Sequence, residues 1–129
     1  MTNELKIRIY YEDTDCGNIV YYANYLRYME RGRTELLRAV GCEFSAYHEK
    51  GLAFVVTEAH VKYKRPARYD DLLTVTTTVK EVANATIVFY TEIRKDDIVL
   101  VYGDVKVACI KLSNGKPERI PAGIIEALL

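Results

Sequence analysis

Tryptophan is absent from this chain of 129 residues, and cysteine, proline and glycine are scarce, with 3, 3 and 7 residues respectively. The three cysteines, Cys16, Cys42 and Cys109, are an odd number at wide spacing. This pattern excludes a disulfide framework and a zinc motif of the C-x-x-C kind. With so few glycines and prolines, the chain contains no low-complexity tract or long linker. Its length suits a single domain over residues 1–129.

Neither sign of charge prevails, because 18 Lys and Arg residues balance 18 Asp and Glu residues. A neutral chain is poorly suited to bind nucleic-acid phosphates or an anionic membrane. No apolar run approaches the roughly 20 residues that span a bilayer, and the first six residues lack the basic and apolar regions of a signal peptide. We therefore expect a cytoplasmic protein with no nucleic-acid partner and no membrane span.

Alternation of apolar and polar residues predicts five strands. They lie at Leu5–Glu12, Phe54–Arg65, 73–79, 85–93 and Ile98–Leu112. Between the first two, apolar residues recur at helical spacing over Tyr22–Val40, and Gly41 marks the end of this helix. Gly32 within the helix costs about 1 kcal/mol relative to alanine, which predicts a close approach to a sheet.

Consecutive strands favour an antiparallel meander, and only one helix is long enough to cover their apolar face. The sequence therefore predicts an α+β fold, in which an antiparallel five-stranded sheet wraps around one long central helix. Such a small sheet leaves open strand edges, and it leaves Val56, Val88 and Tyr90 on the face opposite the helix. Formation of an oligomer would cover these residues and edges.

Polar side chains are densest in Tyr10–Asn18, which joins the first strand to the helix and holds three carboxylates in four residues. Solvent exposure and hydrogen bonds to nearby backbone groups would account for this loop without any chemistry. A calcium loop is excluded, because Asn24 stands where the twelfth-position glutamate belongs. Cys16 is a poor candidate nucleophile, because neighbouring acids oppose formation of a thiolate.

The histidines, the basic residues and the tyrosines are further candidates for a functional role. His48 and His60 have no catalytic partners near them in sequence. A basic run ends the second strand and is either a solvated face or a phosphate contact; it comprises Lys62, Lys64, Arg65 and Arg68. No G-x-G-x-x-G or Walker motif is present, so a nucleotide-binding fold is not predicted. Eleven tyrosines, six of them within residues 10–28, either pack or line a groove for an apolar acyl or aryl group.

Two segments carry a more specific signal. Tyr10–Arg33 begins Y-Y-E-D-T-D-C-G-N-I-V-Y-Y-A-N-Y, and Val61–Leu72 reads V-K-Y-K-R-P-A-R-Y-D-D-L. Both resemble the hotdog-fold acyl-CoA thioesterases, above all the YbgC and 4-hydroxybenzoyl-CoA thioesterase branch, and the likeness extends over almost the whole chain. It implies a hotdog fold and hydrolysis of an acyl-CoA to a carboxylic acid and CoA, with no cofactor or metal. It also implies a homo-oligomer, a dimer at minimum and commonly a tetramer, with the site between subunits.

The resemblance assigns roles to individual residues. The family's catalytic carboxylate corresponds to Asp15, as nucleophile or general base. Its oxyanion donor corresponds to the backbone N–H of Tyr22 at the helix start, where free amides and the helix dipole favour negative charge. Gly17 and Asn18 would make the turn between the two. Many YbgC-type relatives carry histidine where this chain has Tyr22, a change that keeps the backbone role and removes any imidazole role.

A further set of residues is implied to contact substrate. This set is Gly17, Tyr25, Val56, Thr57, Lys62, Lys64 and Arg65. Val56 and Thr57, together with His60, would approach the partner subunit, and the three basic residues would hold the phosphates of CoA.

Two other functions stay open at this stage. A hotdog protein could hold acyl-CoA or acyl carrier protein without hydrolysing it, although the presence of Asp15 argues against this. A dehydratase or hydratase of the same fold would use a histidine with a carboxylate partner, and no histidine lies near the helix start.

Overall fold

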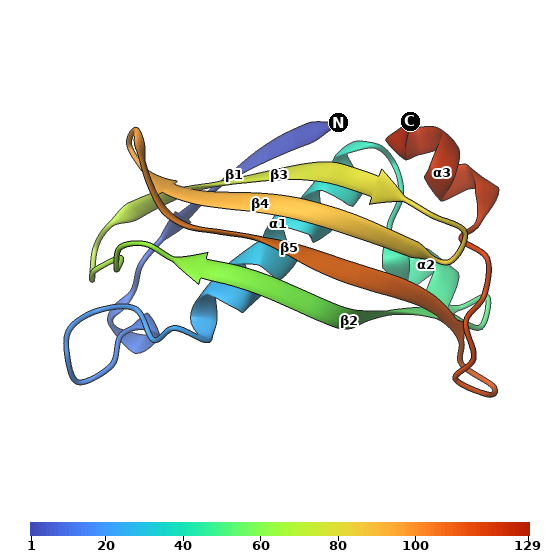
Figure 1. The fold of residues 1–129 in the computed structure, drawn as a ribbon, viewed down its shortest axis with the longest axis horizontal. Helices are drawn as coiled ribbons and strands as arrows, with labels where there is room; N and C mark the ends of the chain where they lie inside the picture. The colour runs from blue at the N-terminus through green and yellow to red at the C-terminus, as the bar shows by residue number, and fades with distance from the viewer.

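Five antiparallel strands form one sheet in the computed structural model, which describes all 129 residues (Figure 1). The strands are β1 (Thr2–Arg8), β2 (Leu52–Tyr63), β3 (Leu72–Val82), β4 (Thr86–Lys95) and β5 (Ile98–Lys111). The helices are the short 3-10 helix η1 (Tyr11–Asp13) and the α-helices α1 (Asn24–Ala39), α2 (Phe44–His48) and α3 (Ala122–Leu128). The predicted α+β fold, with one five-stranded antiparallel sheet and one long helix, is confirmed.

The strand order in the sheet is β1-β3-β4-β5-β2. Strands β3, β4 and β5 form the expected meander. The extension of this meander to β2 was wrong, because β2 pairs with β5, where Val61 lies opposite Gly103. Strand β1 already occupies the free edge of β3, with Leu5 opposite Val75. The chain therefore passes from β1 to the far edge of the sheet through α1 and α2.

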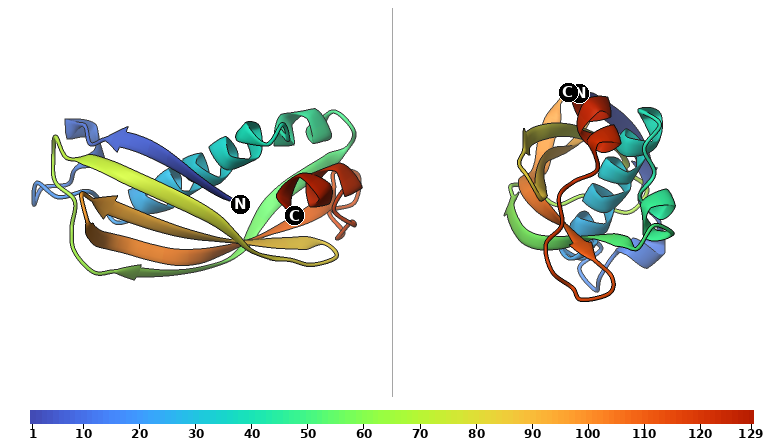
Figure 2. Two further views of the ribbon diagram at one scale, coloured as in Figure 1. Left: turned by 90° about the horizontal axis from the view of Figure 1, so that it is seen from above. Right: turned by 90° about the vertical axis from the view of Figure 1, so that its right-hand side faces the viewer.

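The sheet curves around α1, which lies on its concave side (Figure 2). The helix packs mainly against β1 and β3. An added Cβ at Gly32 would clash with Val75 and Thr77 of β3, so the close helix–sheet approach predicted from this glycine is confirmed. Tyr28 was not predicted to be among the buried residues of this helix, but its side chain is almost fully enclosed in the core.

Strand β2 contains a bulge at Thr57, between Val56, which pairs with Val107, and Glu58, which pairs with Lys106. Val107 belongs to the buried core, and residues directly opposite each other in an antiparallel pair share a face. Val56 therefore lies on the helix-facing side of the sheet, and its predicted place on the opposite side was wrong. The bulge inserts one residue and shifts the inward–outward alternation, which a strict period of two cannot reveal.

Strand β2 is an edge strand, and its residues from Val55 to His60 are exposed. No helix of the structure is both long enough and apolar enough to cross a membrane. The two chain ends lie close together, on β1 and α3, away from the end of the molecule that holds the Tyr10–Ala23 loop (Figures 1 and 2).

Candidate active site

The loop between β1 and α1 folds on itself through hydrogen bonds around Asp15. The Asp15 N–H donates to the Ile19 C=O (2.9 Å), and the Asn18 N–H donates to the Asp15 C=O (3.1 Å). The Asp15 side chain turns back into the loop, where its Oδ1 accepts a hydrogen bond from the Gly17 N–H (2.8 Å). The residue is exposed, so one carboxylate oxygen is fixed and the other remains available to a ligand.

Asn18 makes the sharp turn of this loop, in the left-handed conformation with φ 62°. Gly17, which was predicted to share that role, has no positive φ. Its contribution is its small size and its N–H, because a Cβ at this position would lie only 3.3 Å from Asp15 Oδ1. Gly17 therefore positions the carboxylate.

Helix α1 begins at Asn24, two residues later than the predicted start at Tyr22. The preceding turn is already wound tightly, since the Asn24 N–H donates to the Tyr21 C=O (2.9 Å) and the Leu26 N–H to the Ala23 C=O (3.2 Å). The N–H groups of Tyr22 and Ala23 donate no hydrogen bond within the chain, and no side chain caps the helix. Two free amides at the positive end of the helix dipole favour a negatively charged atom.

One carbonyl group joins the helix start to the loop of Asp15. The C=O of Asp13 accepts hydrogen bonds from the Tyr21 N–H (3.0 Å) and from Asn24 Nδ2 (3.0 Å). These bonds connect Asp13, two residues before Asp15, to Tyr21 and Asn24, the two residues that flank the free amides. The candidate carboxylate and the candidate amides therefore belong to one hydrogen-bonded unit.

A pocket of about 250 Å³ opens beside the helix start. It is lined by Ile19, Val20, Tyr22, Tyr25, Tyr63, Lys64, Arg65 and Pro66. The structure thus brings together four of the residues singled out from the sequence, namely Tyr22, Tyr25, Lys64 and Arg65. No carboxylate lines this pocket, so its charge is basic.

Three tyrosine rings form one wall of the pocket. The ring centroid of Tyr63 lies 6.1 Å from that of Tyr22 and 5.7 Å from that of Tyr25. The Tyr25 hydroxyl accepts a hydrogen bond from the Ala67 N–H (2.9 Å), so it anchors the connection between β2 and β3. Burial raises the pKa of Tyr25 and of Tyr63, which keeps both hydroxyls neutral. Tyr63 was not among the predicted site residues, although its alternation with Lys62 and Lys64 indicated an inward side chain.

The other predicted substrate contacts do not line this pocket. Lys62 pairs with Tyr102 and lines a separate hollow on the outer face of the sheet, which it shares with His60. Val56 and Thr57 lie farther along β2, at the bulge. Lys62 is therefore separated from Lys64 and Arg65, because β2 ends at Tyr63 between them. The N–H groups of Lys64 and Arg65 both donate to the Leu100 C=O, so the regular strand pattern stops there.

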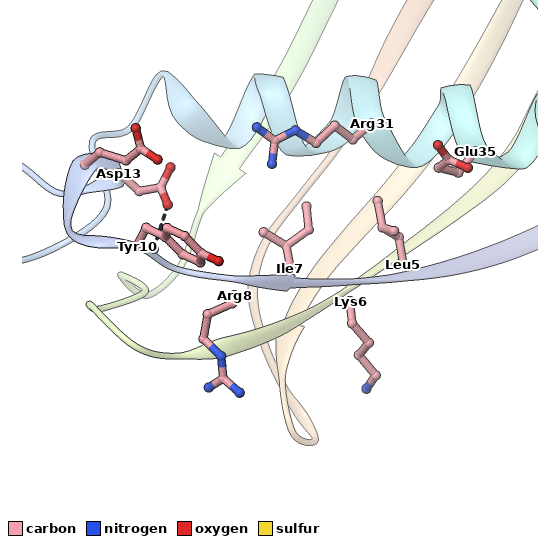
Figure 3. Close-up of a pocket in the computed structure, with 9 residues that line it drawn as sticks. Leu5, Lys6, Ile7, Arg8, Tyr10, Asp13, Arg31 and Glu35 are labelled. Carbon is pink, nitrogen blue, oxygen red and sulfur yellow. Dashed lines mark hydrogen bonds between the residues drawn. The ribbon is translucent and has the colours of Figure 1, made fainter.

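A second groove, of about 430 Å³, lies between β1 and α1 (Figure 3). Leu5 and Ile7 point from β1 toward the helix, and at one end Asp13 accepts a hydrogen bond from the Tyr10 N–H (2.8 Å). Neither Asp15 nor Tyr22 lines this groove, so we do not assign chemistry to it. No group of three or more His, Cys, Asp or Glu side chains lies close enough to hold a metal ion.

Residues 10–128 match the family model of the thioesterase-like superfamily. The chain belongs to this family. Among its relatives, acyl-CoA thioesterase YbgC of Haemophilus influenzae is 44% identical over 116 residues, which are 89% of this chain and 85% of that protein. Acyl-CoA thioester hydrolase YbgC of Escherichia coli is 37% identical over 120 residues, covering 92% of this chain and 90% of the relative.

Solved structures of other proteins share the fold. A hypothetical protein from Aquifex aeolicus superposes with a TM-score of 0.92 at 33% identity, covering 98% of this chain and 99% of that one. A DHNA-CoA thioesterase from Staphylococcus aureus superposes with a TM-score of 0.88 at 25% identity, covering 92% and 80%. The predicted hotdog fold and the predicted enzyme class, a thioesterase, are confirmed. The site residues, the homotetramer and the cytoplasmic location remain predictions.

Proposed function

We propose that this thioesterase hydrolyses an acyl-CoA to a free carboxylic acid and CoA, with Asp15 and the backbone N–H of Tyr22 in its active site. One observation carries the proposal: a single hydrogen-bonded loop holds an exposed carboxylate and two free amides at the start of α1. The relatives from Haemophilus influenzae and Escherichia coli support the substrate class, because both are named for acyl-CoA thioester hydrolysis.

The free amides of Tyr22 and Ala23 would receive the carbonyl oxygen of the thioester. Negative charge develops on this oxygen as the carbonyl carbon becomes tetrahedral. Donors that are already in place stabilise that charge without reorganising, and loss of one such donor in other hydrolases costs about 10² to 10³ in kcat.

Asp15 can complete the reaction by either of two routes. As nucleophile, its free oxygen bonds to the carbonyl carbon, the C–S bond breaks, and CoA leaves as a thiolate that takes a proton from water; water then hydrolyses the mixed anhydride and restores the carboxylate. As general base, Asp15 takes a proton from the attacking water and passes it to the leaving thiolate. The hydrogen bond from Gly17 directs the free oxygen in both routes.

The tyrosine-walled pocket beside the helix start would take the part of the substrate next to the thioester. Lys64 and Arg65 line that pocket, and Lys62 lines the hollow on the outer face of the sheet. All three are candidates to contact CoA phosphates. In this proposal the site is completed between two subunits that meet at the exposed edge of β2, near Val56 and Thr57.

A second candidate function is binding of acyl-CoA or an acyl carrier protein without turnover. The same free amides could hold a thioester carbonyl, and the pocket could hold its acyl group. Release of free thiol from acyl-CoA, followed with dithionitrobenzoate, separates the two: a pure binding protein releases none.

The experiment for the catalytic proposal replaces Asp15 by asparagine and by alanine. We expect kcat on a panel of acyl-CoA esters to fall by about 10³-fold or more, because neither side chain can serve as nucleophile or base. Asp97→Asn, at an exposed position in the β4–β5 hairpin, is the matched control and should keep the parent rate. A folded Asp15→Asn enzyme as fast as the parent would overturn the assignment.

A further inference from the structure

We infer that Asn24 is a positioning residue, which holds the Asp15 loop in register with the free amides of Tyr22 and Ala23. This inference rests on the proposed function and adds a residue that neither the sequence pattern nor the family resemblance singled out.

The side chain of Asn24 bonds to the loop that precedes the helix and does not cap the helix itself. Asparagine accepts hydrogen bonds from the first N–H groups when it is the N-cap residue, whereas the N-cap of α1 is Ala23 and Asn24 is the first residue of the helix. Here the Asn24 amide donates outward, from Nδ2 to the Asp13 C=O (3.0 Å). The N–H groups of Tyr22 and Ala23, just before the helix, are left free, and the side chain binds the loop instead.

Two side chains of α1 reach this loop. Asn24 does so through this hydrogen bond, and Tyr28 lies beside Asp13, since burial and then the nearby Asp13 carboxylate raise the pKa of its hydroxyl. The other side-chain hydrogen bonds of the loop, made by Asp13, Thr14 and Asp15, all stay within it. The tip around Asp15 is likewise held by bonds internal to Asp15–Ile19. After the tip, the loop is anchored to the connection between β2 and β3, because the Val20 N–H donates to the Ala67 C=O (2.9 Å). Before the tip, it is anchored to the start of the helix, because Asp13 is joined to Tyr21 and Asn24. The second anchor links the segment just before Asp15 to the residues that flank the free amides.

Loss of the Asn24 donor would leave the bond from the Tyr21 N–H to the Asp13 C=O intact. We therefore expect the loop to stay folded and to be held less firmly. Catalytic groups tolerate little displacement, since a shift of about 1 Å can cost about 10²-fold in rate. The expected effect is on the chemical step and not on folding.

Asn24→Asp is the decisive variant. Aspartate has the same shape, but its ionised carboxylate cannot donate a hydrogen bond and repels the Asp13 carbonyl. A negative charge in the first turn of a helix does not lower helix stability. We expect kcat to fall 10- to 100-fold, KM for acyl-CoA to stay within about threefold, and the melting temperature to stay within about 3 °C. Asn24→Gln keeps the donor and should lie between Asn24→Asp and the parent.

Asn114→Asp supplies the matched control. Asn114 uses its side-chain oxygen to accept a hydrogen bond from the Lys116 N–H (2.9 Å), so aspartate can replace it there. The same chemical change should leave both kcat and the melting temperature unaltered.

Each other outcome overturns the inference. An Asn24→Asp enzyme with the parent kcat shows that the hydrogen bond has no positioning role. A rise in KM alone indicates a substrate contact, and a joint fall in kcat and melting temperature that Asn24→Gln does not relieve indicates a structural role. Asp15→Asn measured in parallel separates the two proposals: if Asp15→Asn is inactive while Asn24→Asp is not, the inference about Asn24 alone fails.

Discussion

At the scale of single residues, Tyr22 enters the candidate site in two separable ways. Its backbone N–H is free at the start of the helix, and its ring lines the pocket beside Tyr63. The proposed reaction uses the backbone group. This division would allow the side chain at this position to differ without loss of the backbone role.

Substitutions of Tyr22 can separate the two contributions. Tyr22→Phe keeps the N–H and the ring, so kcat should stay within about threefold of the parent. Tyr22→Pro removes the N–H at the second residue of the Tyr21–Asn24 turn, a position that favours proline, so kcat should fall by about 10² to 10³. Steady-state thiol release measures both, with the melting temperature as the control for folding. A folded proline variant of unchanged kcat would show that this amide does not contact the thioester.

Individual site residues differ in how far the sequence could predict them. Asp15 and Tyr22 stand in a contiguous motif, so a resemblance could single them out. Tyr63 and Asn24 act through partners 41 and 11 residues away, Tyr22 and Asp13 respectively, and such contacts exist only after folding. Asn18 shows the same limit locally, because the choice of the left-handed residue between Gly17 and Asn18 is made by the hydrogen bonds of the loop.

At the scale of elements, the contact between α1 and β3 at Gly32 sets how deeply the helix sits in the curved sheet. The backbone of the helix approaches Val75 and Thr77 so closely that no Cβ fits at this glycine. Since the free amides of Tyr22 and Ala23 directly precede α1, this packing contact fixes the helix beside which the candidate site lies.

Gly32→Ala tests that contact. Alanine gains about 1 kcal/mol of helix propensity over glycine, but overpacking against a buried sheet costs about 1 to 3 kcal/mol. We expect a net loss in the free energy of unfolding, measured by urea denaturation. The loss should shrink when Thr77→Ala makes room, because neighbouring substitutions are not additive. Equal losses in both backgrounds would show that the helix and strand are not in tight contact.

The sequence was sufficient to predict the individual strands and α1, but not the order of the strands in the sheet. The five strands and α1 follow from periodicities that a single segment carries. The place of β2 beside β5 depends on which sheet edges are free once β1 has paired with β3, which is a property of the whole chain. The bulge at Thr57 depends on pairing with β5, so the side to which Val56 points could not be derived from β2 alone.

At the scale of the whole molecule, the exposed edge strand β2 is the feature that most needs a partner. It presents unpaired backbone groups and the apolar side chains of Val55 and Val56, which are 38% and 51% exposed. Such an edge invites pairing with another chain. The proposed subunit contact would cover it and complete the site.

Val56→Lys should weaken this contact, because it places a charge on the edge that would be buried between subunits. We expect a shift toward monomer in sedimentation or light scattering, and a parallel loss of thioesterase activity at low protein concentration. Ile98→Lys, at a similarly exposed apolar position in the β4–β5 hairpin, should change neither. A Val56→Lys protein that stays oligomeric and active would rule out β2 as the subunit contact.

The proximity of the two chain ends has a practical consequence. Both lie away from the loop that carries Asp15 (Figure 2), so affinity tags or fluorescent fusions at either end should leave catalysis untouched. A short flexible linker could also join them, and new ends could then be opened at the exposed Asn114–Gly115 turn to give a circular permutant. Such a rearranged chain would keep β1 beside β3 and would allow the order of folding to be changed without altering the reaction.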